Sequence, residues 1–193
     1  MTTAAPDLST SPTMRYRFTV DEYYRMAASG ILPETGRTEL LDGEIYAMSP
    51  VNSPHAGMVN KLTRFFTAHL DESQYLLSVQ NPVRLNAHSE PEPDLAVLRF
   101  LPDFYQSAHP GPSDILLLVE VADSSLEKDR QVKLPLYARA GIPEVWLVNL
   151  AAGHIEVCRR PLDNVFLDQR VYSAQDTLVS GLLGECLASQ ILG

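Results

Sequence analysis

The chain has 193 residues, of which 45% are hydrophobic, and it carries a formal net charge of −9. This length suffices for one domain with a substantial core. The longest apolar run, residues 115–119, is far shorter than the roughly 20 residues that a membrane span needs. The acidic balance argues against non-specific binding to nucleic acid, because proteins that do this usually present a basic face.

The first residues of the chain differ in composition from the rest. Residues 1–13 are small, polar and proline-containing, without the basic start and apolar stretch of a secretory signal, so we interpret them as a disordered tail. No internal repeat or long linker follows, and we expect residues 14–193 to form a single domain. Cys158 and Cys186 show no metal-ligand spacing, which favours a cytoplasmic protein with free thiols.

Two elements are predicted before the first long helix. Thr19 and Glu22 have the spacing of a capping box, so a short helix begins there and ends near Gly30. Residues 38–48 read as a hairpin around the turn dipeptide Asp42-Gly43.

Two longer helices are predicted farther along the chain. Ser53-Pro54 begins one of them, since proline is favoured in the first turn. A capping box at Ser124 and Glu127 predicts the other, which runs to Ala140 and contains Pro135, so we expect a kink.

Apolar runs bounded by turn residues predict the strands of a mixed α/β fold. A strand–helix–strand unit around residues 115–150 should form a right-handed parallel crossover. A short helix ends the chain. The predicted strands are residues 75–85, 94–99, 115–122, 144–150, 154–159 and 165–172.

Two acids at the edges of predicted strands are the strongest candidates for chemistry. Asp94 opens one apolar run and Glu120 closes the next. A carboxylate there is costly unless it is neutralised, hydrogen-bonded or metal-bound, and neighbouring strands lie about 4.8 Å apart. Both acids could therefore share one Mg²⁺ or Mn²⁺ ion, which prefers carboxylate oxygens. The alternative is that each acid only marks a strand end facing water.

Lys133 lies four residues after Asp129 and four before Tyr137, so the three share a helix face. If this face points at the two acids, the lysine would orient a water molecule or offset charge. Taken alone, a solvated stripe with an Asp129–Lys133 ion pair would be the better interpretation.

Three further side chains are secondary candidates. Glu39, on the hairpin, could turn inward as a third carboxylate and complete a metal cage. His55 could contact a phosphate or a water molecule, although a lone histidine in a first helical turn is more often an ordinary surface residue. Gln80 interrupts a strand, and a turn is its default interpretation.

The order of several segments resembles the Uma-two family of restriction-endonuclease-like proteins, which is similar to the PD-(D/E)XK nuclease superfamily. The segments are RFTVDEYYRM, ELLDGEIYAMSP with His55 downstream, SVQNPVRL, EPEPDLAVLR, EVADSS, the Asp129/Lys133/Tyr137 stripe and GIPEVWLV. The resemblance implies a restriction-endonuclease-like core, a central mixed sheet flanked by helices, with an N-terminal helix and hairpin added. It also implies Mg²⁺-dependent cleavage of phosphodiester bonds.

By this resemblance, Pro93-Asp94 matches the PD element and Glu120 matches the second acid. The superfamily's lysine follows that acid by two residues, where this chain has Ala122. Lys133, from the following helix, is the candidate replacement.

The resulting hypothesis is a metal-dependent endonuclease acting on nucleic acid, most readily DNA. Asp94, Glu120, the Val121 carbonyl and Glu39 would hold the ion, and Lys133 would act beside it. Nucleases that cut both strands often pair, so a homodimer is compatible with this hypothesis. Two rivals stay open: a catalytically inactive interaction protein that keeps the fold, favoured by the acidic balance, and a glycoside hydrolase using two carboxylates.

Overall fold

A six-stranded mixed β-sheet forms the centre of the computed structural model, which describes residues 15–32 and 37–193. The strand order is β3-β4-β5-β6-β7-β8. The β5–β6 pair is parallel and every other pair in this sheet is antiparallel. The proposed tail, residues 1–13, lies outside the described residues. The strands are β3 (Tyr75–Val79), β4 (Leu95–Arg99), β5 (Ile115–Ala122), β6 (Glu144–Asn149), β7 (His154–Leu162) and β8 (Val165–Ser173).

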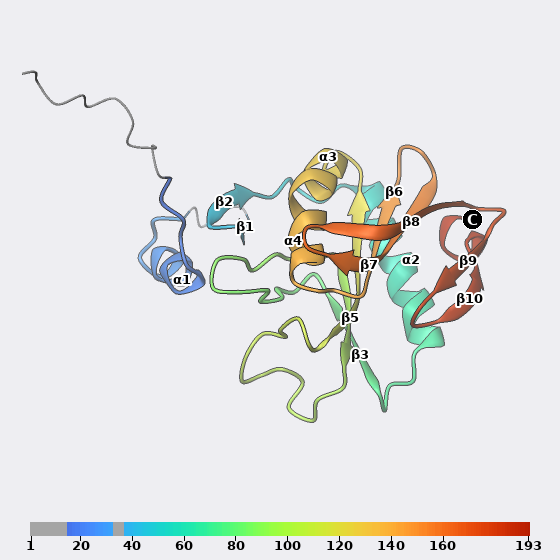
Figure 1. Cartoon of the computed structure of the whole chain (residues 1–193), viewed down its shortest axis with the longest axis horizontal. Helices are drawn as coiled ribbons and strands as arrows, with labels where there is room; N and C mark the ends of the chain where they lie inside the picture. The colour runs from blue at the N-terminus through green and yellow to red at the C-terminus, as the bar shows by residue number, and fades with distance from the viewer. Residues whose placement is uncertain (1–14, 33–36) are drawn as a thin grey trace, which may run out of the picture.

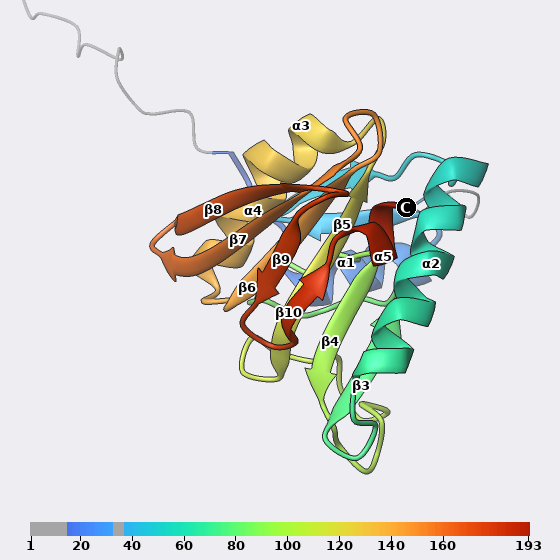
Figure 2. The same ribbon diagram turned by 90° about the vertical axis from the view of Figure 1, so that its right-hand side faces the viewer.

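Helices cover both faces of this sheet, which confirms the predicted mixed α/β class (Figures 1 and 2). One face carries α2 (Ser53–His69), α5 (Ser189–Leu192) and a hairpin of β9 (Thr177–Ser180) and β10 (Gly184–Leu187). The other face carries a helical segment in three parts, α3 (Leu126–Lys128), the π-helix η1 (Asp129–Lys133) and α4 (Leu134–Arg139). A helix, α1 (Val20–Ala28), and a hairpin of β1 (Thr38–Leu41) and β2 (Glu44–Ala47) lie at one side of the sheet (Figure 1).

Alternating side chains divide the hydrophobic core into two layers. Along β4, Leu95 and Val97 pack towards α2, whereas Ala96 and Leu98 pack towards α4. This follows from the two-residue period of a strand. Full burial of side chains such as Phe66 of α2 is worth about 1.5–3 kcal/mol each. The same alternation directs Glu120 of β5 to the face that carries η1 and α4.

The N-terminal elements follow the local rules. The hydroxyl of Thr19 accepts from the Glu22 N–H at 3.2 Å, and the Glu22 carboxylate accepts from the Thr19 N–H at 2.9 Å, which confirms the capping box. Asp42 and Gly43 have φ values of 52° and 80°, as a type I′ turn requires. A Cβ at Gly43 would lie 2.5 Å from the Cβ of Arg17, so the position also demands glycine on steric grounds.

Several predicted boundaries are wrong for local reasons. The strand predicted over 75–85 ends at Val79, because Gln80 adopts a left-handed φ of 52° that leaves the sheet. Asn52, rather than Ser53, caps α2. The second capping box does not form: Ser125 precedes α3 without a capping bond, and its hydroxyl donates to Asp129 at 2.7 Å. The β9–β10 hairpin was not predicted.

The expected kink is a π-helical turn. The N–H of Leu134 donates to the carbonyl of Asp129, five residues earlier, instead of to the carbonyl four residues earlier. Pro135 follows directly in the first turn of α4, and proline both lacks an N–H and displaces the preceding turn. The π-turn adds a residue between Asp129 and α4, which determines where Lys133 points.

The longest helix described, α2, has 17 residues. Across residues 15–32 and 37–193, no helix has the length and apolar character needed to cross a membrane.

Candidate active site

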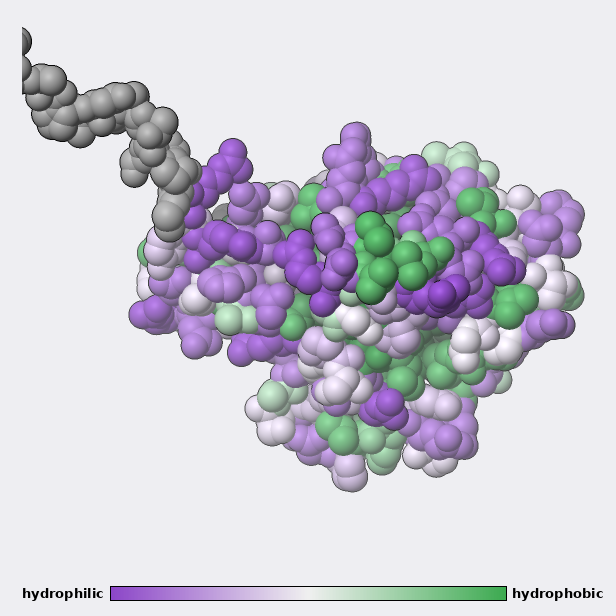
Figure 3. Space-filling view, in the orientation of Figure 1, coloured by the Kyte–Doolittle hydropathy of each residue, from purple (hydrophilic) through white to green (hydrophobic). Residues whose placement is uncertain are grey.

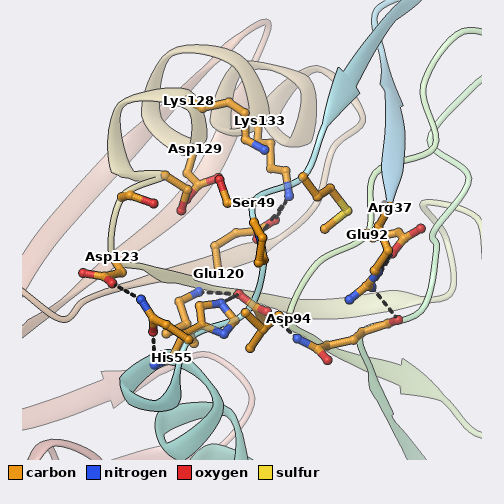
Figure 4. A pocket seen from close by; sticks show the side chains of 18 residues that line it. Arg37, Ser49, His55, Glu92, Asp94, Glu120, Asp123, Lys128, Asp129 and Lys133 are labelled. Atoms are coloured by element: carbon orange, nitrogen blue, oxygen red, sulfur yellow. Dashed lines mark hydrogen bonds and ion pairs between the residues drawn. The ribbon is translucent and has the colours of Figure 1, made fainter. Parts of the chain in front are cut away.

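A small polar cavity of about 100 Å³ opens where β4 and β5 meet the first turn of α2 and the α3–η1 segment (Figure 4). Asp94 immediately precedes β4, and Glu120 lies near the end of β5. Because β4 and β5 are antiparallel neighbours with Leu95 opposite Val119, the two acids lie at the same end of the sheet. The predicted meeting of these acids across neighbouring strands is confirmed.

Glu120 is the centre of a buried network. The ammonium of Lys133 donates to both of its carboxylate oxygens, at 3.1 and 3.2 Å, and the hydroxyl of Tyr137 donates to one at 2.5 Å. All three side chains are 3% exposed or less. The solvated stripe considered from the sequence is therefore wrong, and the π-turn aims Lys133 at Glu120 from the facing helical layer.

Glu39 reaches the same lysine from the β1–β2 hairpin. Its two carboxylate oxygens lie 3.1 Å from the Nζ of Lys133 and 2.8 Å from the Nζ of Lys128. Glu39 is 1% exposed, so it turns inward as expected. Both of its oxygens, however, are engaged by lysines rather than directed at Asp94.

A second network holds Asp94. One carboxylate oxygen accepts from the Val121 N–H at 2.8 Å and lies 3.1 Å from Nε2 of His55. The other accepts from the side-chain amide of Gln80 at 3.2 Å. The left-handed turn at Gln80 serves this geometry, since its N–H also donates to the carbonyl of Asp94 at 3.0 Å.

The two acids have opposite electrostatic environments. Burial raises the pKa of Glu120 to about 8, and the nearby acids add to this, although Lys133 acts in the opposite direction. Burial also acts to raise the pKa of Asp94, but the hydrogen bonds from His55 and the Val121 N–H outweigh it and lower that pKa below its ordinary value. Two crowded and partly buried acids are expected from the sequence to have raised pKa values, and this is right for Glu120 and wrong for Asp94.

His55 is a member of the site, and the surface imidazole that the sequence favours for it is wrong. Asn52 caps α2 by accepting from the His55 N–H at 3.0 Å, and the Asn52 amide donates to Asp123 at 2.6 Å. This fixes the first turn of α2 beside Asp94. The Nδ1 atom of His55 is buried without a hydrogen-bond partner, so Asp94 is the side chain that holds this imidazole.

The cavity has a surplus of negative charge. Its lining includes five carboxylates against three cations, with His55 beside them. A divalent cation would balance this surplus, and the oxygen-rich donors suit Mg²⁺ or Mn²⁺. The carboxylates are Glu92, Asp94, Glu120, Asp123 and Asp129, and the cations are Arg37, Lys128 and Lys133.

The expected cage of three carboxylates is not formed. Within the part of the chain that the structure describes, no three His, Cys, Asp or Glu side chains lie close enough together to hold one metal ion. Glu39 pairs with Lys128 and Lys133 instead. Lys133 also donates to both oxygens of Glu120, so a metal shared by Asp94 and Glu120 would have to take the place of those hydrogen bonds. The residues present therefore fit at most a metal held by these two acids with backbone or water oxygens, and not by Glu39.

Sequence reasoning missed two polar contacts of this site. Lys128 holds Glu39 from α3, and Asp123 holds the capping residue of α2. Lys128 precedes Lys133 by five residues, and residues five apart share a face in a π-helical turn but not in an α-helix. An α-helical pattern could therefore not have predicted that both lysines reach Glu39.

Comparison with known proteins gives the family and agrees with the fold. The profile of the Uma2 family, described as "Putative restriction endonuclease", matches residues 20–186. The fold is similar to the crystal structure of a putative nuclease belonging to DUF820 from Anabaena variabilis ATCC 29413, with a TM-score of 0.69 and 13% sequence identity. The match covers 91% of this chain and 97% of that one. No protein of curated function matches significantly. Since the family profile spans most of its length, the chain belongs to the Uma2 family.

Proposed function

We propose that this protein is a metal-dependent endonuclease that hydrolyses phosphodiester bonds in DNA with Mg²⁺ or Mn²⁺. The observation that carries the proposal is the junction of two networks at one end of the sheet. A buried Glu120–Lys133–Tyr137 network meets an Asp94 carboxylate that is held in its charged form. Membership of a family described as restriction endonucleases supports the same conclusion.

Asp94 and Glu120, with the Val121 carbonyl, would hold the ion in this proposal. When bound, the ion would polarise the scissile phosphate and lower the pKa of a coordinated water. Gln80 and the Val121 N–H orient Asp94 by donating to its two oxygens. His55 secures one of those oxygens through its Nε2 atom.

Lys133 would supply the positive charge that the superfamily places two residues after the second acid. Its ammonium is held at 3.1 Å from both Glu120 and Glu39, so it is fixed before any substrate arrives. Such preorganised charge can stabilise the negative charge that develops on a phosphate without reorganisation. Glu39 and Tyr137 are positioning residues in this proposal, because they act through Lys133 and Glu120.

The test is cleavage of supercoiled, linear and single-stranded DNA, and of RNA, with Mg²⁺ or Mn²⁺. We expect the wild type to cleave DNA, and Asp94→Asn, Glu120→Gln and Lys133→Met each to lose at least 100-fold of that activity. Glu185→Gln, an exposed carboxylate on β10, is the matched control. The proposal fails if all three site variants retain the activity of the control.

A non-catalytic nuclease-fold protein is the rival, and the net charge of −9 favours it, because it opposes contact with a polyanion. Calorimetry with Mn²⁺ separates the two proposals before any substrate is known. Heat of binding that disappears in Asp94→Asn supports the endonuclease, whereas absence of heat and of any melting shift supports the rival.

A further inference from the structure

One edge of the central sheet ends in a long strand with an exposed apolar row. In the described chain, β8 pairs with β7 alone, and its outer edge carries no neighbour. Val165, Leu167 and Val171, at alternate positions on this strand, are 53%, 55% and 61% exposed. Figure 3 shows hydrophobic surface gathered over this region, within a largely hydrophilic face.

Soluble proteins usually protect such an edge with lysine, proline, a bulge or a very short strand. The opposite edge strand, β3, has five residues, whereas β8 has nine and reads VFLDQRVYS, without lysine or proline. A strand of this kind offers backbone N–H and carbonyl groups to another strand. The edge is therefore suited to strand addition.

The sequence of β8 is complementary to itself. If two copies pair antiparallel about a two-fold axis at Gln169, Leu167 of one copy faces Val171 of the other, and Asp168 faces Arg170. Both apolar residues then meet an apolar partner, and both charges meet the opposite charge. Directly opposed pairs of this kind stabilise antiparallel strands.

Neighbouring registers lack this match. Directly opposed residues of an antiparallel pair point to the same face of the sheet, and a two-fold axis perpendicular to the sheet keeps each side chain on its own face. Opposed residues must therefore differ by an even number of positions, so the axis always passes through a residue and can move only by whole residues. Centring it on residue 168 would place Asp168 against its own copy, and centring it on residue 170 would place Arg170 against its own copy. Like charges directly opposite each other are destabilising, so the register centred on Gln169 is favoured over its two neighbours.

We propose that a second copy of this chain binds at this edge, with β8 antiparallel to β8 and Gln169 on the two-fold axis. The interface is isologous, since each protomer contributes the same strand, and it joins two six-stranded sheets into one. In the free protomer Asp168 already contacts Arg159 and Arg170, at 3.0 and 3.1 Å. Arg170 is 60% exposed and has five donors, so it can also bind the second copy's Asp168. The inference does not depend on the proposed activity.

Disulfide trapping tests the register. Opposed residues in an antiparallel pair have Cα atoms about 4.5–5.5 Å apart, within the range that a disulfide spans. We expect Gln169→Cys to form an intermolecular disulfide under mild oxidation, while the wild type and Gln106→Cys, a matched exposed position in the loop after β4, do not. Leu167→Cys and Val171→Cys should each cross-link poorly alone and efficiently when mixed.

Light scattering after size exclusion tests the dimer itself. We expect the wild-type chain to be a dimer and Leu167→Lys to be a monomer. Arg170→Glu places each new glutamate against Asp168 of the second copy and should also dissociate. Arg64→Glu, a control on exposed α2 surface, should remain a dimer. A monomeric wild type at micromolar concentration overturns the proposal. A dimer in which Gln169→Cys cross-links no better than Gln106→Cys overturns it too, because the copies then meet elsewhere.

Discussion

Removing the buried ammonium of Lys133 should destabilise the protein through the acids that it leaves behind. In Lys133→Met the stem is kept and the charge is lost. Lys133 is 3% exposed and contacts Glu120 and Glu39 at 3.1 Å. Breaking a buried ion pair by removing one partner costs about 3–5 kcal/mol. Glu39 retains Lys128, and Glu120, whose pKa is raised to about 8, is largely protonated at neutral pH, so we expect the lower end of that range.

A loss of about 3 kcal/mol corresponds to a fall in melting temperature of roughly 6–12 °C for a chain of this size. The assay is thermal and urea unfolding at neutral pH, followed by circular dichroism. Lys128→Met is the graded comparison, because that lysine is a quarter exposed and, among the described residues, forms an ion pair with Glu39 only. Its loss should cost about 1 kcal/mol. Adding Glu120→Gln to Lys133→Met should recover part of the loss. Equal effects of the two lysine variants, with no recovery in the double variant, would refute the reasoning.

Three further outcomes are expected. The pKa of Glu120 is raised from 4.5 to about 8 in the folded protein, so the native state holds a proton on this carboxyl that the unfolded state has lost. The resulting contribution to the free energy of unfolding is present below about pH 4.5 and is lost as the pH rises to about 8. Urea unfolding of the wild type and of Glu120→Gln across this pH range should show the difference. The hydrogen bond to Asp94 raises the pKa of His55 above its ordinary value of 6.5. Protonated His55 therefore stabilises the folded protein below pH 6.5, and this stabilisation is lost as the pH rises through the folded-state pKa. An NMR titration should place the His55 pKa above 6.5 in the wild type, and the pKa should fall in Asp94→Asn. Gly43→Ala, strained at φ 80° and blocked by Arg17, should lower stability by about 1–3 kcal/mol, whereas Gly57→Ala, in a helix with open space, should raise it by up to about 1 kcal/mol.

Features set by a few adjacent residues could be predicted from the sequence. The Asp42-Gly43 dipeptide favours a type I′ turn because both residues adopt positive φ values readily. This turn then sets the register of the hairpin, in which Glu39 pairs with Tyr46. The capping box at Thr19 is equally local. The meeting of Asp94 and Glu120 required only that consecutive apolar runs pair, which is the commonest arrangement.

Features set by packing across the chain could not be predicted. The sign of the Asp94 pKa shift depends on the Val121 N–H and on His55, which come from two other elements. The capping box predicted at Ser124 does not form: Ser125 precedes the helix, and its hydroxyl donates to the buried Asp129 and accepts no hydrogen bond from the N–H groups of the first turn. The β9–β10 hairpin has short strands of four residues each, too few for a clear alternation.

The position of the lysine departs from the PD-(D/E)XK pattern that the sequence resembles, and this departure can be reversed by design. Ala122 follows Glu120 by two residues on β5, so its side chain points to the same face. Under the proposed function, if the site needs an ammonium near Glu120 rather than Lys133 in particular, Ala122→Lys combined with Lys133→Met should regain at least a tenth of the nuclease activity that Lys133→Met is expected to lose. Ala122→Leu with Lys133→Met is the control for filling that buried position without charge. Recovery in both double variants, or in neither when both fold, would show that the charge at this face does not limit the reaction.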